Sequence, residues 1–247
     1  MRLKDRVALV TGAGRGIGRA IAEALAGEGA AVAVNDISPP DASVETILQS
    51  GGRAFPLPAD VSDPTAHQGM IDAVVDRFGR LDILVNNAAI EIRQPFLEAG
   101  LDAWDAQIGV NLKGPYFLAQ RAARQMILQG DGGRILNTSS VHENRPLRNS
   151  SIYSIGKGGT RLLTRCLALE LAEYGITVNG LAPGAIATDL NREVLADPAN
   201  RDRLLATIPL GRIGEPCDLV AAAILLVSPE AGYITGSTLF VDGGLSL

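Results

Sequence analysis

A phenol and an amine in the stretch SIYSIGKGG (151–159) are spaced so that they could act together. Tyr153 and Lys157 are four residues apart, so on a helix their side chains share one face, one turn apart. A tyrosine hydroxyl can pass a proton to or from a substrate oxygen. The pair predicts a proton-transfer centre, and the alternative is that both residues are ordinary helix surface.

The charge of the amine suggests how the phenol could become a usable base. A free tyrosine has a pKa of about 10, so only about one in a thousand is ionised near neutral pH. Lys157 at about 5 Å, in an effective dielectric near 20, would favour the phenolate by roughly 3 kcal/mol, or about two pKa units. We therefore expect Lys157 to lower the pKa of Tyr153 to about 8.

A glycine-rich turn near the N-terminus, in VALVTGAGRGIGRAIAEAL (7–25), is typical of a phosphate site. Its pattern is Thr11, Gly12, Gly16 and Gly18, with Ile17 standing where a strict G-x-G-x-x-G pattern has its third glycine. Glycines allow a tight turn and a close backbone approach, and the N-terminus of the following helix offers free N–H groups to a pyrophosphate. No Gly-Lys-Ser/Thr follows, which excludes a P-loop.

Two charged residues bear on which dinucleotide this turn would bind. Asp36 ends the second predicted strand, 18 residues after Gly18. A carboxylate there can accept both hydroxyls of an adenosine ribose and would repel a 2′-phosphate. Arg15, inside the turn, could instead pair with that phosphate. We predict NAD as the cofactor, with NADP as the alternative.

Three further stretches complete a pattern: NNAA (86–89), NTSSV (137–141) and YSIGK (153–157). Together with the glycine turn, and in this order over nearly the whole chain, they resemble the short-chain dehydrogenase/reductase family. Members of that family oxidise alcohols or reduce carbonyls with a nicotinamide cofactor. Ala89 departs from the family's more common Asn-Asn-Ala-Gly by one methyl group.

The resemblance implies roles for individual residues. It implies catalysis by Ser140, Tyr153 and Lys157, with Asn111 holding a water in a proton relay. Ser140 would donate a hydrogen bond to the substrate oxygen, and Lys157 would also hold the nicotinamide ribose. The positions that it implies for cofactor binding are Thr11, Gly12, Arg15, Gly16, Ile17, Gly18, Asp36, Asp60, Val61, Asn87, Tyr153, Lys157, Ile186 and Thr188.

The elements that must position these residues follow from the alternation along the chain. Short β-branched runs, several of them apolar throughout, are typical of parallel strands covered on both faces. They lie at 6–12, 31–36, 53–60, 81–89, 133–140, 176–184 and 238–244. Helical patterns lie at 18–30, 67–79, 117–129, 161–175 and 218–228. The pattern predicts a Rossmann fold, a doubly wound, seven-stranded parallel sheet with helices on both faces.

We expect a single domain over residues 1–247, because no linker, repeat or low-complexity segment interrupts the pattern. Residues 184–216 alone break the alternation, with a charged insert between the sixth strand and the last helix. An insert at the carboxyl edge of such a sheet is placed to be a lid over a ligand crevice. A surface excursion is the alternative.

Composition excludes several other classes. The net charge of −5 includes no basic stripe, so we expect no nucleic-acid partner. The longest apolar run (219–227) is about half of a membrane span, and the N-terminus reads as a strand and not as a secretory signal. Cys166 and Cys217 lack metal-ligand spacing; we predict buried free thiols, no metal site and a cytoplasmic location.

The substrate leaves a weaker signal. SSVHE (139–143), the segment up to IGEP (213–216) and the ending DGGLSL resemble bacterial glucose 1-dehydrogenases, and Glu91 falls where those enzymes carry a glutamate. His142 and Glu143 could hydrogen-bond a polyhydroxylated substrate. We therefore predict substrate contacts from Ser140, Tyr153, His142 and Glu91. Ala187 stands where the sugar enzymes tend to have asparagine, which weakens the glucose assignment.

Three functions remain open. The leading prediction is an NAD(P)-dependent oxidoreductase of a secondary alcohol, most of all a sugar or polyol. A 3-oxoacyl-acyl-carrier-protein reductase is the nearest alternative, but it would need a basic docking patch, and the predicted lid mixes both signs: Arg192, Arg201, Arg203, Asp189, Glu193, Asp197 and Asp202. The third is a cofactor-binding regulator without turnover. For assembly, the resemblance implies a homotetramer, with a dimer as the alternative.

Overall fold

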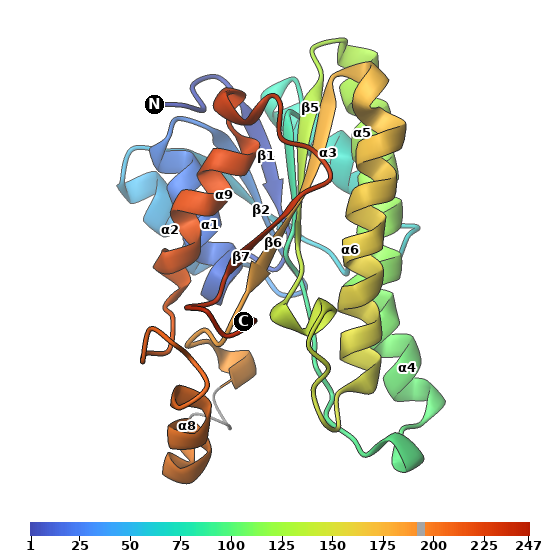
Figure 1. Ribbon diagram of the computed structural model, residues 1–247. Helices are drawn as coiled ribbons and strands as arrows, with labels where there is room; N and C mark the ends of the chain where they lie inside the picture. Colours follow the sequence, from blue (N-terminus) through green and yellow to red (C-terminus); the bar gives the residue numbers. More distant parts are fainter. Residues whose placement is uncertain (192–195) are drawn as a thin grey trace.

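The chain forms a three-layered α/β structure, seen in a computed structural model that describes residues 1–191 and 196–247 (Figure 1). All seven predicted strands are present. They are β1 (Val7–Val10), β2 (Ala31–Asp36), β3 (Arg53–Pro58), β4 (Ile83–Asn86), β5 (Gly133–Thr138), β6 (Ile176–Pro183) and β7 (Thr238–Val241). They form one parallel sheet in the order β3-β2-β1-β4-β5-β6-β7. The predicted fold is confirmed.

The sheet order creates the crevice that a doubly wound fold uses for ligands. The chain runs outward from β1 to β3 and then returns to place β4 on the other side of β1. Loops leaving β1 and β4 therefore diverge to opposite faces, and a gap opens between them at the carboxyl end of the sheet. The glycine turn leaves β1 at this point.

Helices cover both faces of the sheet. They are α1 (Gly16–Gly27), α2 (Asp41–Gln49), α3 (His67–Phe78), α4 (Leu101–Ile108), α5 (Gly114–Gln129), α6 (Ser151–Leu171), α8 (Pro198–Leu205) and α9 (Val220–Val227). In Figure 1, α1, α2 and α9 lie on one side of the sheet and α3, α5 and α6 on the other, while α8 lies below it. Among the described helices, α2, α4 and α8 were not predicted; each is only eight or nine residues long.

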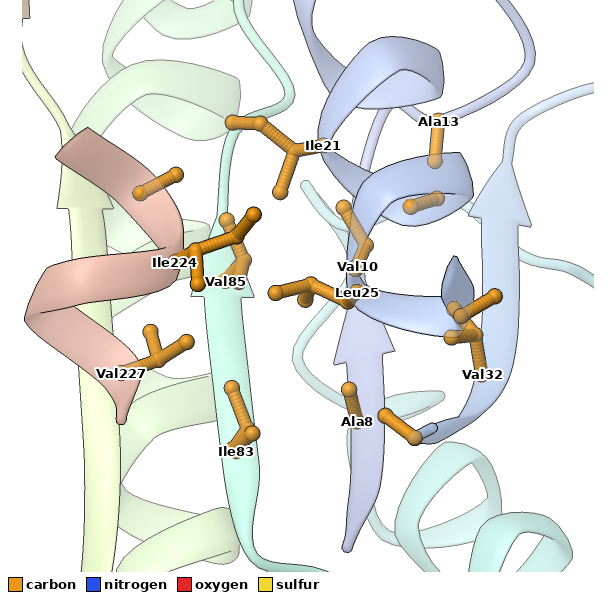
Figure 2. Packing of buried hydrophobic residues seen from close by; sticks show 14 of the residues in the cluster. Ala8, Val10, Ala13, Ile21, Leu25, Val32, Ile83, Val85, Ile224 and Val227 are labelled. Atoms are coloured by element: carbon orange, nitrogen blue, oxygen red, sulfur yellow. The ribbon is translucent and has the colours of Figure 1, made fainter. Parts of the chain in front are cut away.

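Alternation along the strands builds a core on each face. Ala8 and Val10 of β1 join Ile21 and Leu25 of α1 in one fully buried cluster, which Figure 2 shows extending to α9 through Ile224. The neighbouring residues of β1 join α3, α5 and α6 in the second cluster. Burying a leucine or isoleucine side chain stabilises the fold by about 1.5–3 kcal/mol, so the two clusters hold the strand ends rigidly.

The two cysteines correct one prediction. Both Cys166 and Cys217 are exposed free thiols, not buried ones. Cys166 lies on the face of α6 that also exposes Leu162 and Leu169, because the opposite face of this helix packs on the sheet. The apolar residues around Cys166 in the sequence had predicted that this position is buried in the core. Separately, none of the described helices has the length and hydropathy needed to cross a bilayer.

Candidate active site

A cavity of about 640 Å³ opens at the carboxyl ends of the strands, where the sheet order changes direction. Segments from the whole length of the chain line it. The predicted site residues among its lining are Gly12, Arg15, Gly16, Ile17, Asp36, Asp60, Val61, Asn87, Glu91, Ser140, His142, Tyr153, Lys157, Ile186 and Thr188. The structure thus brings fifteen of the eighteen predicted residues to one cavity. Thr11, Gly18 and Asn111 do not line it.

The glycine turn forms one end of the cavity. Gly12 and Gly16 adopt left-handed φ angles of 60° and 56°, which only glycine takes without strain. A Cβ at Gly18 would lie 2.3 Å from the carbonyl oxygen of Gly12, so the helix packs directly on the turn. No side chain caps the N-terminus of α1, which leaves its N–H groups for an anion.

Asn87, which follows the neighbouring strand β4, holds this turn in place through hydrogen bonds. The amide of Asn87 donates to the carbonyl oxygens of Thr11 and Gly12 at 3.0 and 3.1 Å. The Thr11 hydroxyl in turn accepts from the N–H groups of Asn87 and Ala88. Thr11 is therefore buried behind the cavity wall, where it stabilises the turn.

Asp36 is fixed at the rim of the same end. Its carboxylate accepts from the N–H groups of Gly14 at 3.0 Å and Ile37 at 2.8 Å. Asp60 lies nearby on the loop after β3, where the N–H of Ala59 donates to the carbonyl oxygen of Asp36 at 3.0 Å, and it caps its own turn by accepting from the N–H of Ser62. Both carboxylates are thus held by backbone groups, which orients them without a countercharge.

The predicted catalytic groups meet at the middle of the cavity. Ser140 follows β5 and accepts from the N–H of His142 at 3.1 Å, which starts the 3-10 helix Val141–Glu143 (η3). Tyr153 and Lys157 lie one turn apart on α6, with the Lys157 Nζ 5.6 Å from the centre of the Tyr153 ring. Lys157 Nζ also donates to the carbonyl oxygen of Thr138 at 2.8 Å. All three side chains are at least nine-tenths buried.

Burial, and not the lysine charge, dominates the protonation of this pair. Burial raises the pKa of Tyr153, the charge of Glu91 raises it further, and a hydrogen bond to Ser140 opposes both. Burial lowers the pKa of Lys157 to about 8, against a smaller opposing effect of the Glu143 charge. The predicted lowering of the Tyr153 pKa to about 8 is therefore wrong, because burial raises this pKa. The first proton near pH 8 leaves the amine, because desolvating an ammonium outweighs its attraction to neighbours.

Asn111 lies behind the cavity wall. It falls in a π-helical turn (Gly109–Lys113), and its side-chain amide pairs with both backbone groups of Ile90 at 2.8 and 3.0 Å. The backbone carbonyl oxygen of Asn111 accepts a hydrogen bond from the Thr160 hydroxyl at 3.0 Å. The amide therefore anchors the loop after β4, and a part for Asn111 in a proton relay stays a prediction.

At the far end of the cavity, two predicted substrate residues face inward and a third does not. The His142 ring contacts the Tyr153 ring edge-on at 6.3 Å between centroids. Glu91 accepts from the Ser150 hydroxyl at 2.6 Å and from Arg93 at 3.0 Å. Glu143 is fully buried outside the lining and accepts from Ser139 at 2.5 Å. Its expected role as a substrate contact is wrong, because the turn of η3 points it under α6.

Several lining residues were not predicted, among them Arg93, Arg145, Arg203 and Leu245. No motif marks them, since each comes from a different segment that folding brings to the cavity. Among the described residues, the predicted lid contributes nine lining positions: Gly184, Ala185, Ile186, Thr188, Asp189, Asn191, Arg203, Leu204 and Thr207. Asp189 also pairs with Arg15 across the opening at 3.5 Å. Arg192 and Glu193, counted in the lid's charge balance, lie outside the described residues.

Known proteins share this architecture along almost the whole chain. The profile of a family described as Enoyl-(Acyl carrier protein) reductase matches residues 12–246. The chain is 41% identical to glucose 1-dehydrogenase 2 of Bacillus subtilis (99% of this chain, 96% of the relative). It is also 41% identical to 3beta-hydroxysteroid dehydrogenase 1 of Eggerthella lenta (99% and 95%). The solved gluconate 5-dehydrogenase of Burkholderia cenocepacia, in complex with NADP and tartrate, superposes with a TM-score of 0.94 at 40% identity (99% and 96%).

Proposed function

The chain belongs to the short-chain dehydrogenase/reductase family, and from that premise we propose an NAD(P)-dependent oxidoreductase acting on a sugar or polyol. The reaction moves a hydride between the nicotinamide and a secondary alcohol or its carbonyl. One observation carries the proposal. Ser140, Tyr153 and Lys157, from two separate elements, line the same cavity as a glycine turn that suits a pyrophosphate.

The glycine end of the cavity fits a dinucleotide. The uncapped N-terminus of α1 offers N–H groups to the phosphates, and Gly12 and Gly16 leave no side chain in their way. Asp36 would hold the adenosine ribose, with Asp60 and Val61 at the adenine. Thr188 and Ile186 would contact the nicotinamide end. When bound, the nicotinamide supplies the hydride acceptor or donor.

The residues of the chain manage the proton and the oxygen. Ser140 donates to the substrate oxygen and orients the reacting carbon. Tyr153 exchanges the proton with that oxygen. Lys157 lies beneath the phenol and, with a pKa of about 8, passes between charged and neutral forms in the range where the proton must leave. Tyr153 and Lys157 therefore release or take up one proton as a unit.

A sugar or polyol suits the far end better than the alternatives. Glu91 and His142 offer directional hydrogen bonds there, and two of the compared relatives are named as sugar-type dehydrogenases. Against an acyl-carrier-protein reductase, the described part of the 184–216 segment alternates acidic and basic side chains and forms no basic patch.

We extend the proposal to the lid and the assembly. Residues 184–216 act as a substrate lid within a single domain of residues 1–247; the Arg15–Asp189 pair across the cavity opening supports this. A homotetramer fits the exposed apolar side chains of α5 and α6, such as Phe117, Leu128, Leu162 and Leu169. A cytoplasmic location stays a prediction from the two free thiols, Cys166 and Cys217.

A substrate panel tests the function. The purified protein is mixed with NAD or NADP and with sugars, polyols or a 3β-hydroxysteroid, or with the reduced cofactors and acetoacetyl esters, and nicotinamide absorbance is followed. Turnover of a sugar or polyol is the expected result. Exclusive turnover of the steroid or the acetoacetyl ester would replace the substrate class. Tight cofactor binding with no turnover of any compound would mean a regulator.

The cofactor preference rests on Asp36. Its carboxylate would repel a 2′-phosphate, so Asp36→Ala should lower the ratio of kcat/KM with NAD to that with NADP by about tenfold, which corresponds to one lost charge interaction. Asp41→Ala, outside the cavity lining, is the matched control. An unchanged ratio in Asp36→Ala would mean that this carboxylate does not read the ribose.

A further inference from the structure

The half of the cavity beyond Tyr153, away from the glycine turn, carries arginines that the proposed reaction does not use. Arg145 and Arg203 line it together with His142 and Leu245. They come from the loop after η3 and from α8, which are more than fifty residues apart in the sequence. Their common position is therefore a product of the fold.

Arg145 is tied to the wall beside the proposed proton-transfer group. Its Nη1 donates to the carbonyl oxygen of Leu245 at 2.6 Å. Its own carbonyl oxygen lies 2.8 Å from Nδ1 of His142, whose ring contacts Tyr153. The hydrogen bond to Leu245 leaves most of the guanidinium donors of Arg145 for a ligand.

Arg203 reaches the same place from the other side. Leu204, its neighbour on α8, packs against the buried cluster of Val141, Ile208 and Leu245. Leu245, which accepts the hydrogen bond of Arg145, thus belongs to the cluster on which the helix carrying Arg203 packs. The Arg203 guanidinium donates to the carbonyl oxygen of Ala199 at 3.2 Å and to Asn200 Oδ1 at 2.6 Å. Both partners are neutral, so the charge of Arg203 is not balanced by them.

The half of the cavity beyond Tyr153 carries an excess of positive charge. Glu91 is its acidic group in the lining, and Arg93 already neutralises it at 3.0 Å. Asp189 pairs with Arg15 at the other end. Within residues 1–191 and 196–247, neither Arg145 nor Arg203 has a carboxylate oxygen within 4.0 Å. An anion is the ligand that balances two guanidinium groups.

We infer that the substrate is a sugar acid, a polyhydroxy carboxylate whose carboxylate group is bound by Arg145 and Arg203. This inference rests on the proposed function and specifies its substrate. The carboxylate would lie beside Leu245, the hydroxyls would meet His142 and Glu91, and the reacting carbon would lie at Ser140 and Tyr153. The secondary alcohol becomes a ketone as its C–H hydrogen leaves as hydride to the oxidised nicotinamide and its O–H proton passes to the phenolate form of Tyr153.

Matched pairs of compounds test the charge alone. Three pairs of compounds differ only in that a carboxylate replaces a CH2OH group. They are D-gluconate and D-glucitol, D-galactonate and D-galactitol, and D-glucuronate and D-glucose. In at least one pair, kcat/KM should be at least tenfold higher for the acid. Arg145→Gln and Arg203→Gln should each reduce that advantage about tenfold through KM, and leave the rate with the neutral partner nearly unchanged. Arg148→Gln, an exposed arginine outside the lining, is the control.

The outcomes separate this inference from the proposed function. If neutral members react as well as the acids in every pair that turns over, the sugar-acid inference is wrong and the oxidoreductase proposal stands. The same holds if neither arginine variant, with a melting temperature like that of the wild type, changes the ratio. If no member of any pair reacts with either cofactor, the proposed sugar or polyol substrate falls and this inference falls with it.

Discussion

Tyr153 shows how burial and charge compete over a single side chain. Its hydroxyl is enclosed by the same packing that places it on the cavity wall, and this enclosure raises its pKa. The amine that could offset this is itself desolvated and bonded to a carbonyl oxygen. Burial therefore keeps the proton on the phenol, and a positively charged ligand in the cavity would favour the phenolate.

Removing the phenol hydroxyl should stop the chemistry and spare the cofactor. Tyr153→Phe keeps the ring in its buried place but has no proton to exchange, so kcat should fall by about 10²–10⁴-fold. Cofactor affinity, measured by fluorescence titration, should stay close to that of the wild type. Tyr174→Phe, at an exposed tyrosine, is the control. A wild-type rate in Tyr153→Phe would show that another group carries the proton.

The buried Glu143 should tune the amine from outside the cavity. Burial raises the pKa of Glu143, and its negative charge raises the pKa of Lys157. Glu143→Gln keeps the hydrogen bond to Ser139 but removes the charge, which also pairs with Arg161, so the pKa of Lys157 should fall below 8.

The pH dependence of kcat/KM reports this shift. In Glu143→Gln, the rise in rate associated with loss of the first proton should move to lower pH. Glu173→Gln, an exposed glutamate after α6, should leave the profile in place. A profile that does not move, together with a lower melting temperature, would mean that Glu143 only supports the packing of η3 on α6.

At the scale of elements, the junction of β1 and α1 depends on a close approach that only glycine permits. Gly18 packs its Cα against the carbonyl oxygen of Gly12 and the amide of Asn87. The turn, the helix and the loop after β4 are therefore held as one unit. This contact keeps the N-terminus of α1 aimed into the cavity, where the phosphates would bind.

Two glycines on the same helix give a direct test. A Cβ at Gly18 would lie 2.3 Å from Gly12 O and 2.4 Å from Asn87 Nδ2, whereas one at Gly27 would meet nothing within 4 Å. Gly18→Ala should therefore lower the free energy of unfolding by about 1–3 kcal/mol and weaken cofactor binding. Gly27→Ala should be neutral or stabilise by up to about 1 kcal/mol. Denaturant unfolding and cofactor titration measure both, and equal behaviour of the two variants would contradict the packing account.

At the scale of the whole molecule, the two ends of the sheet have different tasks. The carboxyl end carries the cavity, while the amino end is closed by a charged network around Asp82. This buried carboxylate accepts from Arg6, Arg80 and the N–H of Val7 at 2.7–3.1 Å. It therefore joins the start of β1 to the start of β4, far from the chemistry.

This division predicts that stability and activity separate. Asp82→Ala leaves the N–H of Val7 without its partner and removes charged hydrogen bonds, so the free energy of unfolding should fall by about 2–4 kcal/mol, with KM unchanged at a temperature where the variant is folded. Asp131→Ala, which removes an exposed partner of Arg80, should cost less than about 1 kcal/mol. A large change in KM for Asp82→Ala would show that the two ends are coupled.

The sequence alone was enough to determine the parallel sheet, the glycine turn and the placement of Ser140, Tyr153 and Lys157. Each of these depends on local spacing, and the carboxyl ends of parallel strands must meet at one edge. Short helices such as α2 were beyond it, because this helix has nine residues and buries three of them, one of which is the polar Ser43.

Tertiary structure decided what depends on burial and on distant neighbours. The inward turn of Glu143, the exposure of Cys166 and the low pKa of Lys157 each follow from which surfaces enclose a side chain. The presence of Arg145 and Arg203 in the lining of one cavity likewise joins segments that share no local pattern. Desolvation sums contributions from many segments at once, so no short stretch of residues carries it.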